Sequence, residues 1–130
     1  MRYKRFPRLG AAMIIGATSA AADQAPPQAT AEEVSALVAD VQPCWNIDLG
    51  SAAGRIMITV AFDLDPEGRV VGDVRLLKAP PSNEVVVESA FQAARRAVLR
   101  CQGAGYESIS SGGESRSVRL TFDPSGTRMR

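Results

Sequence analysis

Beyond residue 30 the apolar residues first recur at helical spacing. Four of them stand at i, i+3, i+4 and i+7: Val34, Leu37, Val38 and Val41. The segment TAEE at 30–33 has the spacing of a capping box, in which the Thr hydroxyl and the Glu carboxylate each satisfy a backbone N–H of the first turn. The pattern predicts an amphipathic helix that begins after Thr30, with Cys44 extending its inward stripe.

From Arg55 the period changes to two. The apolar positions of a first segment are Ile56, Ile58, Val60, Phe62 and Leu64, the pattern of a strand with one buried face. Those of a second segment are Val70, Val74 and Leu76. Between them, DPEG at 65–68 places Asp, Pro and Gly at positions i, i+1 and i+3 of a type I turn. The two segments are therefore predicted to form a β-hairpin that ends before Pro80.

Residues 84 to about 102 return to the helical period. One stripe of this segment is apolar: Val87, Ala90, Phe91, Ala94, Val98 and Cys101. Ser82 or Asn83 is suited to cap the start of a helix, and Gly103 is suited to end it. A second, longer amphipathic helix is therefore predicted here.

The remaining residues complete an α-β-β-α-β order. The Gly- and Ser-rich residues 103–116 are predicted to form a mobile loop, and alternation within 118–123 predicts a last strand. A helix of about 19 residues spans roughly 28 Å, so it can return the chain across the sheet and place the last strand beside the first. We expect an α+β domain over residues 31–126, with a three-stranded antiparallel sheet of order 2-1-3 packed with two helices. Residues 127–130 are expected to be a tail.

Residues 1–22 are predicted to be an export signal. A basic start, with Arg2, Lys4, Arg5 and Arg8, precedes an apolar run that ends in three alanines before Asp23. The 14 residues 9–22 are fewer than the roughly 20 that cross a bilayer. We therefore favour cleavage after Ala22 and export over a retained membrane anchor, with the Pro- and Ala-rich residues 23–30 as a flexible tail.

Charge and size limit the classes of function. The chain has 15 Lys and Arg against 14 Asp and Glu. Removal of residues 1–22 takes four of the basic residues, which leaves 11 against 14 and a net charge of −3. This balance gives no reason to expect nucleic acid as a partner. The 108 residues that remain of 130 are enough for one small domain.

Cys44 and Cys101 are the two cysteines of the chain. An even number of cysteines in an exported chain is typical of a disulfide, and both residues lie at the inward-facing ends of the predicted helices. The chain has no histidine, and a zinc site needs about four ligands. We therefore predict a disulfide, with a reactive thiol or a metal ligand as the alternatives.

Four segments in this order resemble one protein family. They are CWN at 44–46, VAFDLDPEGRVVGDVRL at 60–76, AFQAARRAVLRCQ at 90–102 and VRLTFDP at 118–124. Together with the cysteine pair, they are similar to the C-terminal domain of TolA in its alphaproteobacterial form, within the wider group of TolA and TonB C-terminal domains. The resemblance covers residues 34 to 125.

The resemblance implies a function as well as a fold. It implies a periplasmic domain of the Tol-Pal envelope system that binds TolB and Pal, with no enzymatic activity and no cofactor, and it supports the pairing of Cys44 with Cys101. Family members carry a transmembrane anchor and a long spacer before this domain, whereas here only residues 23–30 separate the predicted cleavage site from the first helix. They also tend to carry an aromatic residue after the Tyr that precedes the last strand, whereas ESISSGGESRS follows Tyr106 here.

Three groups of residues are candidate sites. The unpaired edge of the last strand can accept an extended peptide, and its candidate partner-binding residues are Arg119, Leu120, Thr121 and Asp123. A possible patch for an acidic partner consists of Arg95, Arg96 and Arg100, although such residues often form the solvated face of a helix. The hairpin carboxylates are Asp63, Asp65 and Glu67, whose spacing lacks the Gly and the final Glu of a calcium loop, so we expect no metal.

Catalysis is not expected. The chain has no histidine to act as a base, and no group is placed to activate Ser115 of GGES. The sequence therefore predicts a non-catalytic protein-binding module. A TonB-like energy transducer, which would need a retained anchor, and a small secreted hydrolase, which would need a free nucleophile, are the alternatives.

Overall fold

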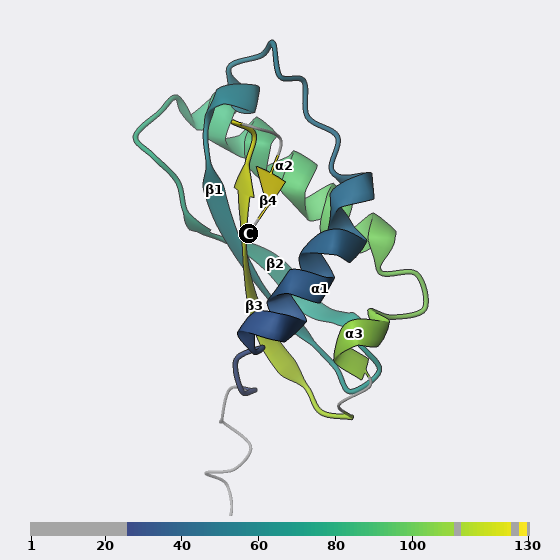
Figure 1. Ribbon diagram of the computed structural model, residues 1–130. Helices are drawn as coiled ribbons and strands as arrows, with labels where there is room; N and C mark the ends of the chain where they lie inside the picture. Colours follow the sequence, from purple (N-terminus) through teal and green to yellow (C-terminus); the bar gives the residue numbers. More distant parts are fainter. Residues whose placement is uncertain (1–25, 111–112, 126–127, 130) are drawn as a thin grey trace, which may run out of the picture.

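The computed structural model describes residues 26–110, 113–125 and 128–129. The predicted signal segment, residues 1–22, lies outside this part of the chain, as do residues 23–25 of the predicted tail. The described residues form one hydrophobic core that draws on every major helix and strand. In Figure 1, α1 and α2 run in crossing directions beside a twisted sheet.

The elements follow the predicted α-β-β-α-β order, with short additions. The helices are α1 (Ala31–Val41), α2 (Glu84–Cys101) and α3 (Glu107–Ser110), and two 3-10 turns are η2 (Gln42–Cys44) and η3 (Ala53–Arg55). The strands are β1 (Ile58–Leu64), β2 (Val70–Lys78), β3 (Arg116–Asp123) and β4 (Arg128–Met129). The predicted capping box is present, because Glu33 N–H donates to the Thr30 hydroxyl and Thr30 N–H donates to the Glu33 carboxylate.

The sheet confirms the predicted antiparallel arrangement. Its order is β2-β1-β3-β4, so the three long strands have the order 2-1-3. The pairing of β1 with β3 runs from Ile58↔Phe122 to Leu64↔Arg116 without a register shift, whereas the pairing of β1 with β2 contains two shifts. The two-residue β4 pairs with the end of β3 and was not predicted.

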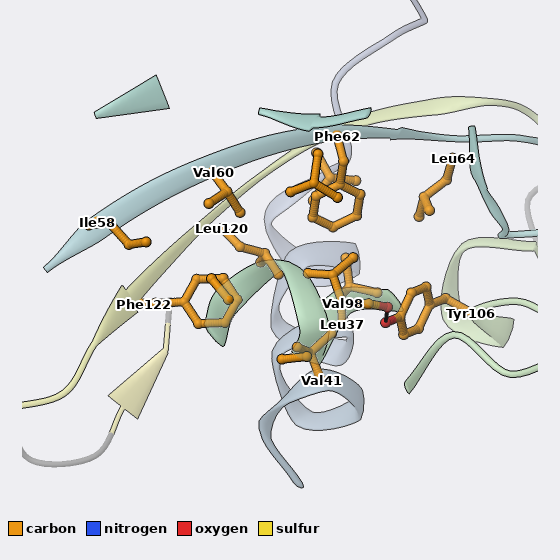
Figure 2. Packing of buried hydrophobic residues seen from close by; sticks show 14 of the residues in the cluster. Leu37, Val41, Ile58, Val60, Phe62, Leu64, Val98, Tyr106, Leu120 and Phe122 are labelled. Atoms are coloured by element: carbon orange, nitrogen blue, oxygen red, sulfur yellow. Dashed lines mark hydrogen bonds between the residues drawn. The ribbon is translucent and has the colours of Figure 1, made fainter. Parts of the chain in front are cut away.

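One face of the sheet forms the core. Figure 2 shows side chains of β1 and β3 pointing toward the helices, where they meet residues of α1 and α2. The fully buried side chains include Leu37, Val41, Val60, Phe62, Val98 and Leu120. On the opposite face most side chains of the strands remain partly or fully exposed, with Ala61 a buried exception. The molecule therefore has a helix-covered face and an open face.

One expectation about local structure is wrong, and another holds only in part. Within the segment expected to be a mobile loop, Tyr106 and Ile109 are buried in the core and residues 107–110 form α3. Tyr106 N–H donates to Gly68 O over 2.7 Å, which fixes this segment against the β1–β2 turn. Leu76 pairs with the buried Val60 and therefore lies on the helix side of the sheet, as predicted, but it is 40% exposed because β2 is an outer strand.

The disulfide is present. Cys44 and Cys101 are bonded, with their Cα atoms 5.9 Å apart, within the usual range for a disulfide. The bond joins η2 to the last residue of α2. Beside it, the Trp45 ring meets the Phe122 ring edge to face, with centroids 5.2 Å apart. The cysteines therefore staple the two helical ends next to β3, and Trp45 fluorescence can report on this packing.

The phenol of Tyr106 gives a pH-dependent prediction. Its O–H donates to Val98 O inside the core, and burial, helped by the charge of Asp40, raises its pKa. Because the pKa of this phenol is raised in the folded state, its contribution to the free energy of unfolding is constant below about pH 10, the usual pKa of tyrosine. The contribution decreases as the pH rises beyond that value. We expect urea midpoints to begin to fall near that pH, before the buried phenol ionises in the folded chain and tyrosinate absorbance makes its late rise. The Tyr106→Phe variant should lose this part of the pH dependence; an equal fall in the variant would contradict the assignment.

Candidate functional site

The outer edge of β3 is the candidate binding site, and its two ends are already occupied by the chain itself. At one end, Ala29 N–H donates to Ser117 O over 2.9 Å and Ser117 N–H donates to Pro27 O over 2.8 Å. At the other end, β4 pairs with Phe122 and Asp123. Within the described ranges, nothing pairs with the outer edge of residues 118–121. Between these two short partners the described part of the chain leaves a central gap of four residues on the edge.

The direction of the backbone groups in this gap follows from antiparallel geometry. Neighbouring residues of a strand direct their N–H and C=O groups to opposite edges. Because Ser117 uses both groups on the outer edge, Arg119 and Thr121 point theirs outward as well. Leu120 points its groups toward Val60 of β1, with which it pairs. The gap therefore offers two N–H donors and two C=O acceptors to an added strand.

The two long edges of the sheet differ in regularity. The register of β3 with β1 is unbroken over seven residue pairs. In contrast, β2 carries register shifts near Leu77 and around 72–74, and Gly72 has φ of 72°. Bulges and irregular twist hinder strand addition at an edge. The regular edge of β3 is consequently the better template for an added strand.

The residues predicted to bind a partner lie in different environments. Arg119 is exposed, and the Thr121 hydroxyl lies 2.9 Å from that of Thr59 on the open face. The side chain of Leu120 is fully buried and belongs to the core, so it offers no surface. The Asp123 carboxylate accepts hydrogen bonds from the N–H and the hydroxyl of Ser125. An added strand would therefore meet the side chains of Arg119 and Thr121.

An ion pair fixes the chain segment at the start of this edge. Arg116 Nε lies 3.1 Å from Glu33 Oε1, and both side chains are largely buried. The backbone N–H of Thr30 chiefly, and then the Arg116 guanidinium, lower the pKa of Glu33. The first turn of α1 is thereby attached to β3 next to Ser117. This attachment holds residues 27–29 in place, and it is a contact that the apolar periods of the sequence could not indicate.

The arginines of the other candidate patch lie on α2. Arg95, Arg96 and Arg100 are all exposed. They belong to the helical layer, whereas the candidate edge belongs to the sheet, so the structure does not join the two into one site. Their role toward an acidic partner stays a prediction.

The hairpin carboxylates have structural partners. Asp63 faces Arg75 at 4.0 Å, and the Asp65 carboxylate accepts from Glu67 N–H and Arg69 N–H at 2.9 Å each. Among the described residues, no group of three or more metal-binding side chains lies together. Asp65 therefore serves the turn, as its position in DPEG indicated.

Comparisons with family models, curated proteins and solved structures found no match to this chain. In the described ranges, none of the helices has the length and apolar character required to span a membrane. The class that the fold defines is a small disulfide-stapled α+β domain with a partly open sheet edge.

Proposed function

We propose that the chain is an exported, non-catalytic protein-binding module that resembles the TolA C-terminal domain. It acts in or alongside the Tol-Pal envelope system of the periplasm, with TolB or Pal as its partner, and it binds by accepting a strand at the outer edge of β3. The observation that carries this proposal is the edge itself. The strand that forms this edge pairs with β1 in an unbroken register, and the edge already binds two short segments of its own chain, residues 27–29 and β4. Among the described residues, none pairs with the outward backbone groups of Arg119 and Thr121, so these groups can pair with a strand of a partner.

The length of the gap bears on how a partner strand fits. At about 3.3 Å per residue, residues 118–121 accommodate a segment of only four residues. A longer partner strand must displace residues 27–29 or β4; each pairs with β3 through only two backbone hydrogen bonds or two residue pairs, and residues 27–29 are held further by the ion pair of Glu33 with Arg116. The short pairings therefore make the edge accessible while protecting it from pairing with another copy of the chain.

The disulfide supports the proposed compartment. Disulfides persist in the bacterial periplasm and are rare in the reducing cytosol. Cys44 and Cys101 are bonded in this structure. A stapled domain of this size is suited to export.

A proline at the edge tests the proposal. Thr121→Pro removes an outward N–H while leaving the pairing of Leu120 with Val60 in place. We expect its affinity for purified TolB or Pal, measured by calorimetry with the full chain, to fall about tenfold or more, because a backbone hydrogen bond of the added strand is lost and the proline ring obstructs it.

Two variants serve as controls. Thr121→Val keeps the N–H and removes the hydroxyl, so it should bind nearly as well as the unchanged chain. Leu76→Pro places a proline on the outer edge of β2, since Leu76 pairs with Val60, whose backbone groups face β3. Trp45 fluorescence shows that each variant is folded. Equal affinities of folded Thr121→Pro and the unchanged chain would disprove strand addition at β3.

A further inference from the structure

The open face of the sheet is hollowed beside the β3 edge. One hollow, of about 400 Å³, lies over all three long strands and is lined by Thr59, Leu77, Lys78, Arg119 and Thr121. A second, of about 490 Å³, extends past the ends of β1 and β2 to Arg55, Met57 and Pro80. Because Thr59 and Lys78 line both hollows, the two hollows adjoin, and we call them together the cationic groove. It lies opposite the helix-covered face of Figure 2.

The charged residues of this groove are all of one sign. Arg55, Lys78 and Arg119 line it, and no carboxylate does. None of these three cations forms an ion pair with another residue that the structure describes. By contrast, the hollow of about 720 Å³ along the first turns of α2 is lined by Glu84 and Glu88 and by no cation. The cationic groove is therefore a hollow of the described surface that favours carboxylates.

Apolar side chains lie between the cations. Met57 is 46% exposed and Leu77 is 49% exposed. The hydroxyls of Thr59 and Thr121 are hydrogen-bonded to each other, so they compete little for a ligand. Exposed apolar groups next to cations favour a ligand that carries both carboxylates and apolar side chains.

We infer that the cationic groove binds an acidic, extended segment of the partner protein, in which carboxylate side chains flank apolar ones. This inference rests on the proposed function, because Arg119 and Thr121 belong to both surfaces. A strand paired with the edge of β3 places alternate side chains on the open face beside Arg119. The same segment continues over the face toward Lys78 and Arg55, so the edge supplies backbone pairing and the groove supplies selectivity.

The charges of the open face distinguish a peptide from a broad anionic surface. Asp63 of β1 and Asp123 of β3 lie on the same open face of the sheet, but neither of them lines the cationic groove. A flat anionic bilayer or a nucleic acid would approach these carboxylates too and be repelled. A narrow acidic segment that follows the groove avoids them.

The test uses two synthetic capped hexapeptides, Asp-Val-Glu-Leu-Asp-Val and Lys-Val-Lys-Leu-Lys-Val, titrated into the isotope-labelled full chain. We expect the acidic peptide alone to shift the amide signals of Thr59 and Lys78. In Arg55→Glu/Lys78→Glu, whose altered side chains lie away from the β3 edge, its affinity should fall about tenfold. The double variant Arg95→Glu/Arg96→Glu tests the other candidate patch, on α2: a loss of affinity in this variant that equals the loss in Arg55→Glu/Lys78→Glu would overturn the inference.

The outcomes separate this inference from the proposed function. If charge reversal weakens binding and Thr121→Pro does not, the groove stands and strand addition is wrong. If Thr121→Pro weakens binding and charge reversal does not, strand addition stands and the groove is overturned. Equal binding of both peptides, shifts confined to α2, or binding to phosphatidylglycerol vesicles without any peptide-induced shift would also overturn it.

Discussion

Reducing the bond between Cys44 and Cys101 lowers the free energy of unfolding of the chain by about 2–4 kcal/mol. The bond closes a span of 57 residues, for which the chain-entropy model gives about 4 kcal/mol as an upper value. It also holds η2 and Trp45 against the end of α2 and Phe122. Because small domains have limited stability, a loss of this size removes a large share of it.

Urea unfolding followed by Trp45 fluorescence measures this effect. The midpoint of the unreduced chain is compared with that of the chain in excess reductant, and Cys44→Ala/Cys101→Ala in the same reductant controls for solvent effects. The double variant should have the same midpoint with and without reductant. A difference of less than about 1 kcal/mol between the oxidised and reduced chains would contradict a stabilising staple.

Gly105→Ala destabilises the domain by at least about 2 kcal/mol. Gly105 has φ of 137°, and a Cβ at this position would lie 2.1 Å from Glu67 O. The contact is between two backbone segments, so no flexible side chain can move aside. Since this approach seats the β1–β2 turn against residues 103–106, the substitution also disturbs the hydrogen bond from Tyr106 N–H to Gly68 O.

Gly103→Ala is the matched control for this prediction. Gly103 lies two residues earlier and also has a positive φ, of 51°, but a Cβ there meets nothing within 4 Å. Its cost is limited to backbone strain, about 1 kcal/mol. Thermal or urea unfolding of the two variants should rank Gly105→Ala well below Gly103→Ala. Equal stabilities would show that the close approach to Glu67 is not required.

The long elements could be predicted from sequence because their signals extend over many residues. The apolar stripe of residues 34–41, with its capping box, predicted α1 nearly to the residue, and the period of two predicted β1 and β3. The disulfide followed from the cysteine count and from the inward position of both cysteines. Order 2-1-3 followed from the length of α2 and the handedness of crossovers.

The short contacts could not be predicted, since they carry no period. The helix α3 is a single turn, too brief to show a helical stripe, and the burial of Tyr106 depends on a tertiary contact with Val98. Alternation placed Leu76 on the correct face, opposite Val60, but it could not show that β2 is an outer strand, which leaves this side chain 40% exposed.

The candidate site was predicted only in outline for the same reason. The residues of the β3 edge were identified from their alternation, which correctly separates Arg119 and Thr121 from the core side but cannot say which backbone groups are occupied. The pairing of Ser117 with residues 27–29, and of Asp123 with β4, joins segments distant in sequence. Likewise, the cationic groove collects Arg55, Lys78 and Arg119 from η3, β2 and β3.

An NMR titration of the isotope-labelled chain with a peptide from the N-terminus of the same organism's TolB tests the central proposal most directly. Strand addition predicts that the amides of Arg119 and Thr121 shift and become protected from hydrogen exchange, while that of Leu120, already directed toward β1, gains little protection. Absence of any change at millimolar peptide, or changes confined to the β2 edge around Leu76, would contradict binding at β3.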